Sequence, residues 1–283
     1  MRNLHHSVPQ FVGVVAAGVV AASTLAACTQ ESGTAEGGIE IVHEGHLTIC
    51  THLPYPPFQF TNDDGEIVGF DVDLLDLLAD DLGVERTSDD IVNIGWEQVT
   101  SGAVFEADRC DVGMGAMTIT DERAAALTIS DPYFEATQAM LVRTDEPYAS
   151  LEELDGERVG VQTDTTGQVY AQGLEEEMGY EVVKYDDLAL QLNALKAGNI
   201  AAAINDNSPL ADFAEQNPDT EVSAQFDTGE VYGFAFKKDD SNAEELAERF
   251  NDQLAQAFED GTYAEIYQRW FETEVPFELP PGQ

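Results

Sequence analysis

The residues best suited to bind a small anion lie in the middle of the chain, after an apolar run. Residues 112–116 predict a buried strand, and Thr118 and Thr120 precede a run of helix formers that they can cap. A strand that leads directly into a helix leaves backbone N–H groups free to bind an anion. Arg123 lies at this corner and can hold a carboxylate with two parallel hydrogen bonds. The alternative for Arg123 is a weak surface ion pair with Asp121 or another acid.

This corner is one of several strand ends that the sequence predicts. Residues 45–135 alternate between strand and helix, and the alternation restarts at Arg158, which indicates two α/β lobes with mainly parallel sheets. In the first lobe, apolar residues at every fourth position predict a helix that begins near Phe70 and ends at Gly83. In open α/β sheets, ligands bind beyond the carboxyl ends of the strands. The candidate binding residues at these ends are His52, Tyr55, Trp96 and Ala116–Arg123 in the first lobe, and Gln162–Gly167 and Asn205–Asp206 in the second.

Five segments spread over residues 45–273 resemble, in the same order, the family 3 extracellular solute-binding proteins, which serve amino-acid ABC importers. These segments are CTHLPYPPFQF, GFDVDLLDLLADDLG, DVGMGAMTITDERAAALTISDPYF, LDGERVGVQTDTTGQVYA and FEDGTYAEIYQRWF. The resemblance implies a two-lobed α/β periplasmic-binding fold of type II, which closes on one amino acid around a two-strand hinge. The implied domains are lobe 1 from residues 44–139 and 231–276, lobe 2 from residues 140–230, and a C-terminal tail, 277–283.

The resemblance also implies roles for individual residues. At the position of Arg123 the family holds the ligand carboxylate, with Thr118 beside it, and at the position of Asp206 it holds the ligand ammonium. Tyr55 and Trp96 fall where the family stacks aromatic rings on the ligand side chain, by van der Waals contact or cation–π attraction. For Trp96, packing in the core is an equal alternative.

The remaining positions at the implied cleft leave the ligand's identity open. Ala116 falls at a cleft position, whereas His52 stands where the family often has an acid, Gln162 where glutamine binders often have a base, and Thr166 where some members have Gly. A neutral imidazole offers one donor and one acceptor, so we expect His52 to contact a polar side chain, with a structural His as the alternative. We expect a polar amino acid as the ligand, and an osmolyte such as ectoine is the alternative.

The N-terminus predicts an exported protein that is anchored by a lipid on the extracytoplasmic face of the cell membrane. Residues 11–22 form an uncharged apolar core, and Leu25–Cys28 after it resembles a bacterial lipobox; together they predict a signal peptide over residues 1–27 and lipidation of Cys28. The alternative is an uncleaved anchor, because the uncharged run reaches the short limit for a membrane span. Residues 28–43 are largely polar and contain several Gly residues, and they predict a flexible tether.

Charge and cysteine content limit the partners. The chain carries 55 Asp and Glu against 12 Lys and Arg, a net charge of −43, which excludes nucleic acid but not a small zwitterion. The expected partners are an amino acid, the permease subunits of an ABC transporter, and the membrane through the lipid on Cys28; the protein itself is expected to be a monomer. The resemblance places His52 and Ala116 at the cleft, two residues after Cys50 and six after Cys110. On neighbouring parallel strands this offset of about four residues is roughly 13 Å, so Cys50 and Cys110 are expected to be free thiols. Without a Cys-x-x-Cys motif or a Cys/His cluster, we expect no metal and no cofactor.

The sequence favours binding over catalysis, and we expect no catalytic residues. Gly-x-Ser-x-Gly, His-Glu-x-x-His and Walker-type motifs are all missing from the sequence. The alternative is a dehydratase of the cyclohexadienyl or arogenate type, because such enzymes share the implied fold. A purely structural surface lipoprotein would leave the convergence of Arg123 and Asp206 unexplained.

Overall fold

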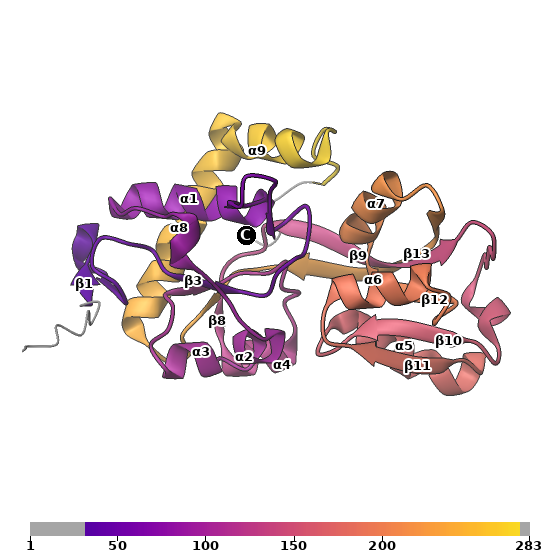
Figure 1. The fold of residues 1–283 in the computed structure, drawn as a ribbon. Helices are drawn as coiled ribbons and strands as arrows, with labels where there is room; N and C mark the ends of the chain where they lie inside the picture. Colours follow the sequence, from indigo (N-terminus) through magenta and orange to yellow (C-terminus); the bar gives the residue numbers. More distant parts are fainter. Residues whose placement is uncertain (1–31, 278–283) are drawn as a thin grey trace, which may run out of the picture. The chain divides into compact units, whose positions relative to one another are not determined.

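The computed structural model describes residues 32–277 (Figure 1), so the predicted signal peptide and the predicted lipid site at Cys28 lie outside the described residues. Two five-stranded sheets organise this part of the chain. We call the first sheet with its helices lobe 1, and the second sheet with its helices lobe 2. No helix within 32–277 is long and apolar enough to cross a membrane.

The sheet of lobe 1 has the strand order β6-β3-β7-β14-β8. β3 pairs in parallel with β6 and β7, whereas β14 pairs antiparallel with β7 and β8. These strands are β3 (Ile49–Thr51), β6 (Ile91–Asn93), β7 (Val112–Gly113), β8 (Thr128–Ile129) and β14 (Ala235–Phe236). A separate small hairpin is formed by β4 (Phe60–Thr61) and β5 (Ile67–Val68). Since the parallel strands β3, β6 and β7 point the same way, their carboxyl ends meet at one edge of the sheet.

Helices cover both faces of this sheet (Figure 1). One face carries α1 (Phe70–Leu82), α8 (Ser241–Asp260) and α9 (Thr262–Phe271), and the other carries α2 (Trp96–Thr100), α3 (Ala103–Glu106) and α4 (Asp121–Ala126); the 3-10 helix η2 (Ser88–Asp90) precedes β6. Successive strand residues point to opposite faces, so Ile49 packs with the α1–α8–α9 core and Cys50 with the α2–α3 core. The predicted helix is α1, which ends at Gly83 in the left-handed conformation with a φ of 64°.

The sheet of lobe 2 has the strand order β11-β10-β12-β9-β13. Its strands are β9 (Phe134–Arg143), β10 (Arg158–Gln162), β11 (Glu181–Tyr185), β12 (Ala202–Asp206) and β13 (Thr220–Tyr232). Its helices are η3 (Leu151–Leu154), α5 (Thr166–Met178), α6 (Leu188–Lys196) and α7 (Asn207–Gln216). β10 and β12 run parallel and end at Gln162 and Asp206, which brings these two residues to the same edge of the second sheet.

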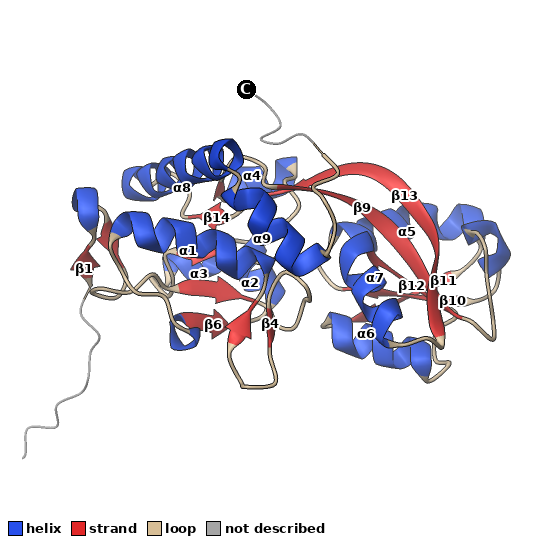
Figure 2. Cartoon of the chain, turned by 90° about the horizontal axis from the view of Figure 1, so that it is seen from above, coloured by secondary structure: helices blue, strands red, loops and turns tan. Residues whose placement is uncertain are grey.

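Two long strands join the lobes. β9 and β13 pair antiparallel from Thr220↔Arg143 to Tyr232↔Phe134, and Figure 2 shows them as the long strands that continue into the second sheet. Phe134 and Tyr232 stack on each other with ring centroids 5.5 Å apart, and both belong to the aromatic core that includes α1 and α9. Each strand therefore begins or ends in the core of lobe 1 and runs into lobe 2. The predicted domain boundaries inside these strands stay a prediction.

The expectation of a flexible tether over residues 28–43 is wrong for the part that the structure describes. β1 (Gly33–Thr34), the 3-10 helix η1 (Glu36–Gly38) and β2 (Glu40–Ile41) form a small hairpin. The side chains of Ile39 and Ile41 are 1% and 2% exposed and pack into the core of lobe 1. Their apolar burial outweighs the flexible composition of the residues around them. At the other end, Phe277 of the predicted tail packs against Phe134 and Tyr267.

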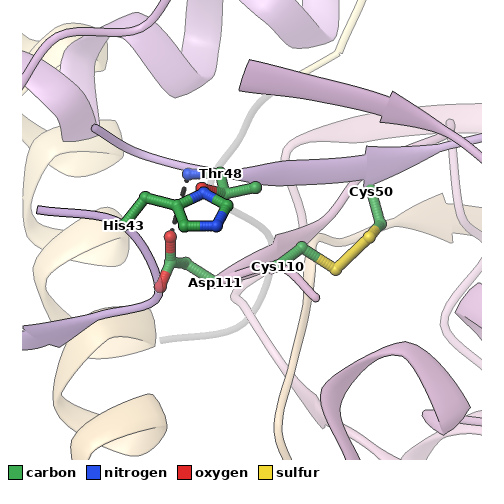
Figure 3. The surroundings of a disulfide bond; sticks show 5 residues. All are labelled: His43, Thr48, Cys50, Cys110 and Asp111. Atoms are coloured by element: carbon green, nitrogen blue, oxygen red, sulfur yellow. Dashed lines mark hydrogen bonds between the residues drawn. A yellow bond between two sulfur atoms is a disulfide. The ribbon is translucent and has the colours of Figure 1, made fainter. Parts of the chain in front are cut away.

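The expectation of free thiols is also wrong, because Cys50 and Cys110 form a disulfide bond with their Cα atoms 5.7 Å apart (Figure 3). The predicted separation assumed that Cys110 lies on the straight continuation of a strand. β7 is short, however, and its residue Gly113 is the one that pairs with Cys50. Cys110 follows a turn at Asp108, whose φ is 47°, and approaches β3 on the α2–α3 side to which Cys50 points. The next residue, Asp111, accepts a hydrogen bond from Thr48 N at 2.8 Å (Figure 3).

Candidate functional site

All nine predicted binding residues line a single pocket. The space among the lining side chains is about 370 Å³, including the part that is open to solvent. The predicted residues in its wall are His52, Tyr55, Trp96, Ala116, Thr118, Arg123, Gln162, Thr166 and Asp206, and the wall also includes Gln59, Gly115 and Thr165. The pocket lies where the carboxyl ends of the parallel strands in the two lobes face each other, as expected for α/β sheets.

Arg123 is buried in this pocket, with 9% of its surface exposed. Its Nη1 donates a hydrogen bond to Thr118 O at 2.9 Å, and its Nη2 donates to Asp164 O at 3.2 Å. Within residues 32–277, no carboxylate forms a salt bridge with Arg123, which argues against the surface ion pair. Burial lowers the pKa of Arg123, while the charges of Asp206 and Glu230 oppose that shift. The guanidinium stays charged and keeps free N–H donors.

The corner that carries Arg123 is held in place by local hydrogen bonds. Thr120 caps α4, because its side-chain oxygen accepts a hydrogen bond from Arg123 N at 3.2 Å. Ala116 adopts a left-handed conformation with a φ of 49°, and its N–H donates to Asp71 on α1 at 2.9 Å. Burial raises the pKa of the Asp71 carboxyl to about 7. Asp71 therefore fixes an unusual backbone conformation directly at the pocket wall.

Asp206 is the acidic group of the pocket. It is 6% exposed, and its carboxylate accepts hydrogen bonds from the Tyr55 hydroxyl at 2.8 Å, from Gln138 Nε2 and from the Tyr232 hydroxyl. Burial raises its pKa to about 6; the charge of Glu230 adds to this, and the three hydrogen bonds oppose it. A carboxylate buried at this depth is suited to pair with a cation that enters the pocket.

Several hydrogen bonds cross from one lobe to the other at the pocket. Trp96 Nε1 donates to Asp164 O at 3.0 Å, and Arg123 donates to the same oxygen. The Tyr55 hydroxyl of lobe 1 lies 2.7 Å from Asn205 Oδ1 of lobe 2. Trp96 also packs in the α2–α3 core and lies under the Arg123 guanidinium, with 5.5 Å between Cζ and the ring centroid. Trp96 therefore packs in the core and also lines the pocket, which are the two alternatives that the sequence left open.

Other residues at the pocket were missed by sequence reasoning. Glu230 on β13 accepts hydrogen bonds from the hydroxyls of Thr118 at 2.8 Å and Thr166 at 2.7 Å, which come from different lobes. Gln138 on β9 donates through one Nε2 atom to both Glu230 and Asp206. Both residues lie on the joining strands rather than at a strand end, so no local pattern marked them.

The groups present suit a zwitterion rather than a metal ion. No cluster of three or more His, Cys, Asp or Glu side chains that could hold a metal occurs among residues 32–277. Among the residues that line the pocket, Arg123 of lobe 1 supplies a guanidinium and Asp206 of lobe 2 a carboxylate, and the other lining residues supply hydroxyl and amide groups. A molecule with a carboxylate and an ammonium could contact both lobes at once.

Comparison with known proteins identifies relatives over most of the chain. The family model described as "Bacterial extracellular solute-binding proteins, family 3" matches residues 47–273. The chain is 30% identical to ABC transporter arginine-binding protein 1 of Escherichia coli, over 77% of this chain and 87% of that protein. It is 33% identical to the ABC transporter glutamine-binding protein GlnH of Bacillus subtilis, over 74% of this chain and 75% of that protein.

A solved structure shows the same fold. The arginine-, lysine-, histidine-binding protein ArtJ of Geobacillus stearothermophilus is 32% identical and covers 82% of this chain and 97% of its own, with a TM-score of 0.70. This similarity confirms the predicted two-lobed α/β fold of the periplasmic binding proteins. The three relatives are named for binding and not for catalysis, which agrees with the expectation that this protein is not an enzyme.

Proposed function

Because the chain belongs to the bacterial extracellular solute-binding proteins of family 3, we propose that it captures a polar amino acid between its lobes and delivers it to the permease of an ABC importer. Two of the relatives are themselves named as ABC transporter components that bind arginine or glutamine. The proposal assigns the same type of ligand to the pocket between the two lobes.

The proposed pose places the ligand carboxylate on Arg123 and the ligand ammonium on Asp206. Arg123 keeps N–H donors that its two carbonyl partners do not use, and the Thr118 backbone lies beside it. Asp206 offers a buried carboxylate already fixed by three hydrogen bonds. Tyr55 and Trp96 would pack on the rest of the ligand, and Ala116, Gln162 and Thr166 would complete the wall.

The observation that carries this proposal is the isolation of Arg123. A buried guanidinium without a carboxylate partner among the described residues is costly unless an anion pairs with it in the functional state. An amino-acid carboxylate is such an anion, and it brings the ammonium that Asp206 needs. Because the two charges come from different lobes, ligand binding would favour the closed arrangement.

The proposal also includes the cellular setting. We propose that residues 1–27 are a signal peptide, that Cys28 carries a lipid, and that the mature protein is a monomer held at the extracytoplasmic face of the cell membrane. The sequence motif at Leu25–Cys28 supports this assignment. A tethered binding protein would stay close to the permease to which it passes its ligand.

The direct test is a screen of the purified protein against all proteinogenic L-amino acids by thermal shift, followed by calorimetric titration of each hit. A ligand at one hundred times its dissociation constant should stabilise the protein by about 2.7 kcal/mol. Carboxamide derivatives, in which the α-carboxylate is neutralised, serve as matched controls and should bind far more weakly. Failure of every amino acid to shift the transition would contradict the proposed function.

A further inference from the structure

A buried carboxylate lies directly behind the wall of the pocket. Asp71 on α1 is 0% exposed, and its Oδ2 accepts a hydrogen bond from the N–H of Ala116, which lines the pocket. Within residues 32–277, no Lys, Arg or His side chain forms a salt bridge with Asp71. Burial of a carboxylate without a cation is costly, so its contact with the pocket wall points to a role in binding rather than in stability.

The backbone is anchored on both sides of Ala116. Before it, Met114 N donates to a carbonyl of β3 at 2.9 Å, and after it, Ile119 N donates to a carbonyl of β13 at 2.8 Å. Ala116 itself has a φ of 49°, and this left-handed conformation is unfavourable for a residue that carries a Cβ atom. The hydrogen bond to Asp71 therefore lies at the strained residue between two fixed points.

The same corner packs against Trp96 and leads to the proposed carboxylate site. A Cβ atom placed on Gly115 would lie 2.6 Å from Trp96 Cζ3, so the indole lies directly against this glycine. Two residues after Ala116, the Thr118 carbonyl accepts the hydrogen bond from Arg123 Nη1. The backbone conformation at Ala116 thus sets the direction in which the chain reaches Thr118, and with it the carbonyl that holds Arg123.

The Asp71 carboxylate is itself held in one orientation. The Tyr133 hydroxyl donates to Asp71 Oδ1 at 2.8 Å, which leaves Oδ2 for Ala116 N at 2.9 Å. The Tyr133 ring is fully buried and stacks on Phe234 with centroids 4.5 Å apart, and the Tyr133 carbonyl accepts from the Tyr263 hydroxyl at 2.6 Å. These contacts fix the tyrosine, and the tyrosine directs the second oxygen of Asp71 at the corner.

We infer that Asp71 is a positioning residue for ligand binding, which acts by holding Ala116 in its left-handed conformation. This inference rests on the proposed function, because it takes the corner to bind the carboxylate of an amino acid. Without the hydrogen bond, the backbone at Ala116 would relax, and the corner that is competent for binding would become a minor conformation. The apparent affinity then falls in proportion to the fraction of molecules that keep that conformation.

Substitutions of Asp71 test this role. Asp71→Ala removes the acceptor, and we expect it to weaken binding of the tightest proteinogenic L-amino acid of the screen by about tenfold or more. Asp71→Asn keeps an oxygen for the Ala116 N–H, and the Tyr133 hydroxyl can accept from its NH₂ group, so it should lose only about threefold. Calorimetric titration measures the affinities. A folded Asp71→Ala protein that binds this amino acid within threefold of the unmodified protein would overturn the inference.

A second substitution distinguishes positioning from general damage to the fold. Glycine adopts the left-handed conformation without strain, so Ala116→Gly in the Asp71→Ala background should restore at least about threefold of the lost affinity. In the unmodified protein the same change should not raise the affinity, because Asp71 already holds the conformation. A double variant that binds no more tightly than Asp71→Ala would overturn the inference.

Asp111 provides the matched control. It also accepts hydrogen bonds from two backbone N–H groups, those of Thr48 and Val42, each at 2.8 Å, and it lies outside the pocket. Asp111→Ala should lower the thermal stability and leave the affinity unchanged. An equal loss of affinity in Asp111→Ala and Asp71→Ala would show that the loss reflects destabilisation alone, and the inference would be overturned.

Failure of the inference can be told apart from failure of the proposed function. If no amino acid binds the unmodified protein, the proposed function fails and the inference fails with it. If an amino acid binds and Asp71→Ala does not weaken it, only the inference is overturned. Circular dichroism reports folding; if Asp71→Ala does not fold, the comparison is made with Asp71→Asn, and an Asn variant as tight as the unmodified protein would overturn the inference.

Discussion

Removal of the Arg123 side chain should weaken amino-acid binding strongly while leaving the fold intact. The guanidinium has five N–H donors, and the structure gives two of its hydrogen bonds to Thr118 O and Asp164 O. The other donors remain for a ligand carboxylate. Thr118 lines the pocket and Asp164 is exposed, so neither partner is a core residue and Arg123→Ala should not unfold the protein.

The expected loss follows from the burial of the charge. Loss of one partner from a buried, hydrogen-bonded charge pair costs about 2 to 5 kcal/mol, which corresponds to a roughly thirtyfold to several-thousandfold loss of affinity. Arg123→Lys keeps the charge but replaces the planar fork with a single ammonium, which cannot reach two carbonyls and a carboxylate at once. It should therefore recover only part of the binding.

Calorimetric titration with the ligand found in the screen measures both effects, and circular dichroism reports folding. Arg158→Ala is the matched control, because Arg158 is exposed on β10 outside the pocket, and its affinity should match that of the unmodified protein. A folded Arg123→Ala protein that binds its ligand within threefold of the unmodified protein would refute the carboxylate assignment.

Four further predictions follow from the site and the N-terminus. Glu230→Gln should weaken amino-acid binding by about tenfold or more, because it removes the charge from the hydrogen bonds that Glu230 accepts from Thr118 in lobe 1 and Thr166 in lobe 2. The control Glu176→Gln changes an exposed residue and should have no effect in the same calorimetric titration. Because the pKa of Asp206 is raised to about 6 and its ionised form must hold the ammonium, affinity should fall by about tenfold between pH 7 and pH 5; a flat calorimetric profile would contradict this. Small-angle scattering should show compaction with saturating ligand, and identical curves would indicate a rigid pocket. Cys28→Ala should release the protein from the membrane fraction or block its processing, and retention at the same apparent mass would contradict lipidation.

Stretches with a local pattern could be predicted from the sequence alone. The helix from Phe70 to Leu82 is such a case, because its apolar side chains recur at helical spacing and Gly83 supplies the left-handed end. The ends of the strands could be located in the same way. Because parallel strands end at the same edge of a sheet, the polar or aromatic residues that directly follow them were expected to lie close together. This is why Trp96, Gln162 and Asp206 could be proposed as neighbours although they are far apart in the chain.

The errors occurred where the decisive interaction was between distant parts of the chain. The separation of Cys50 and Cys110 depended on where β7 begins and how the chain turns at Asp108, and neither leaves a periodic signal. Ile39 and Ile41 sit among residues typical of a tether, yet the core of lobe 1 offers them a buried place. Composition describes what a segment prefers when alone, whereas burial depends on the surface that it meets.

The finer chemistry of the pocket was decided only by tertiary structure. Sequence position placed His52 at a strand end, but the hydrogen bond from Nδ1 to Ile94 O determines which of its nitrogens is left for a ligand. Likewise, Glu230 reaches Thr118 and Thr166 only because β13 passes between the two lobes. Residue type sets which hydrogen bonds a side chain can make, and the packing of distant segments determines which of them remain free for the ligand.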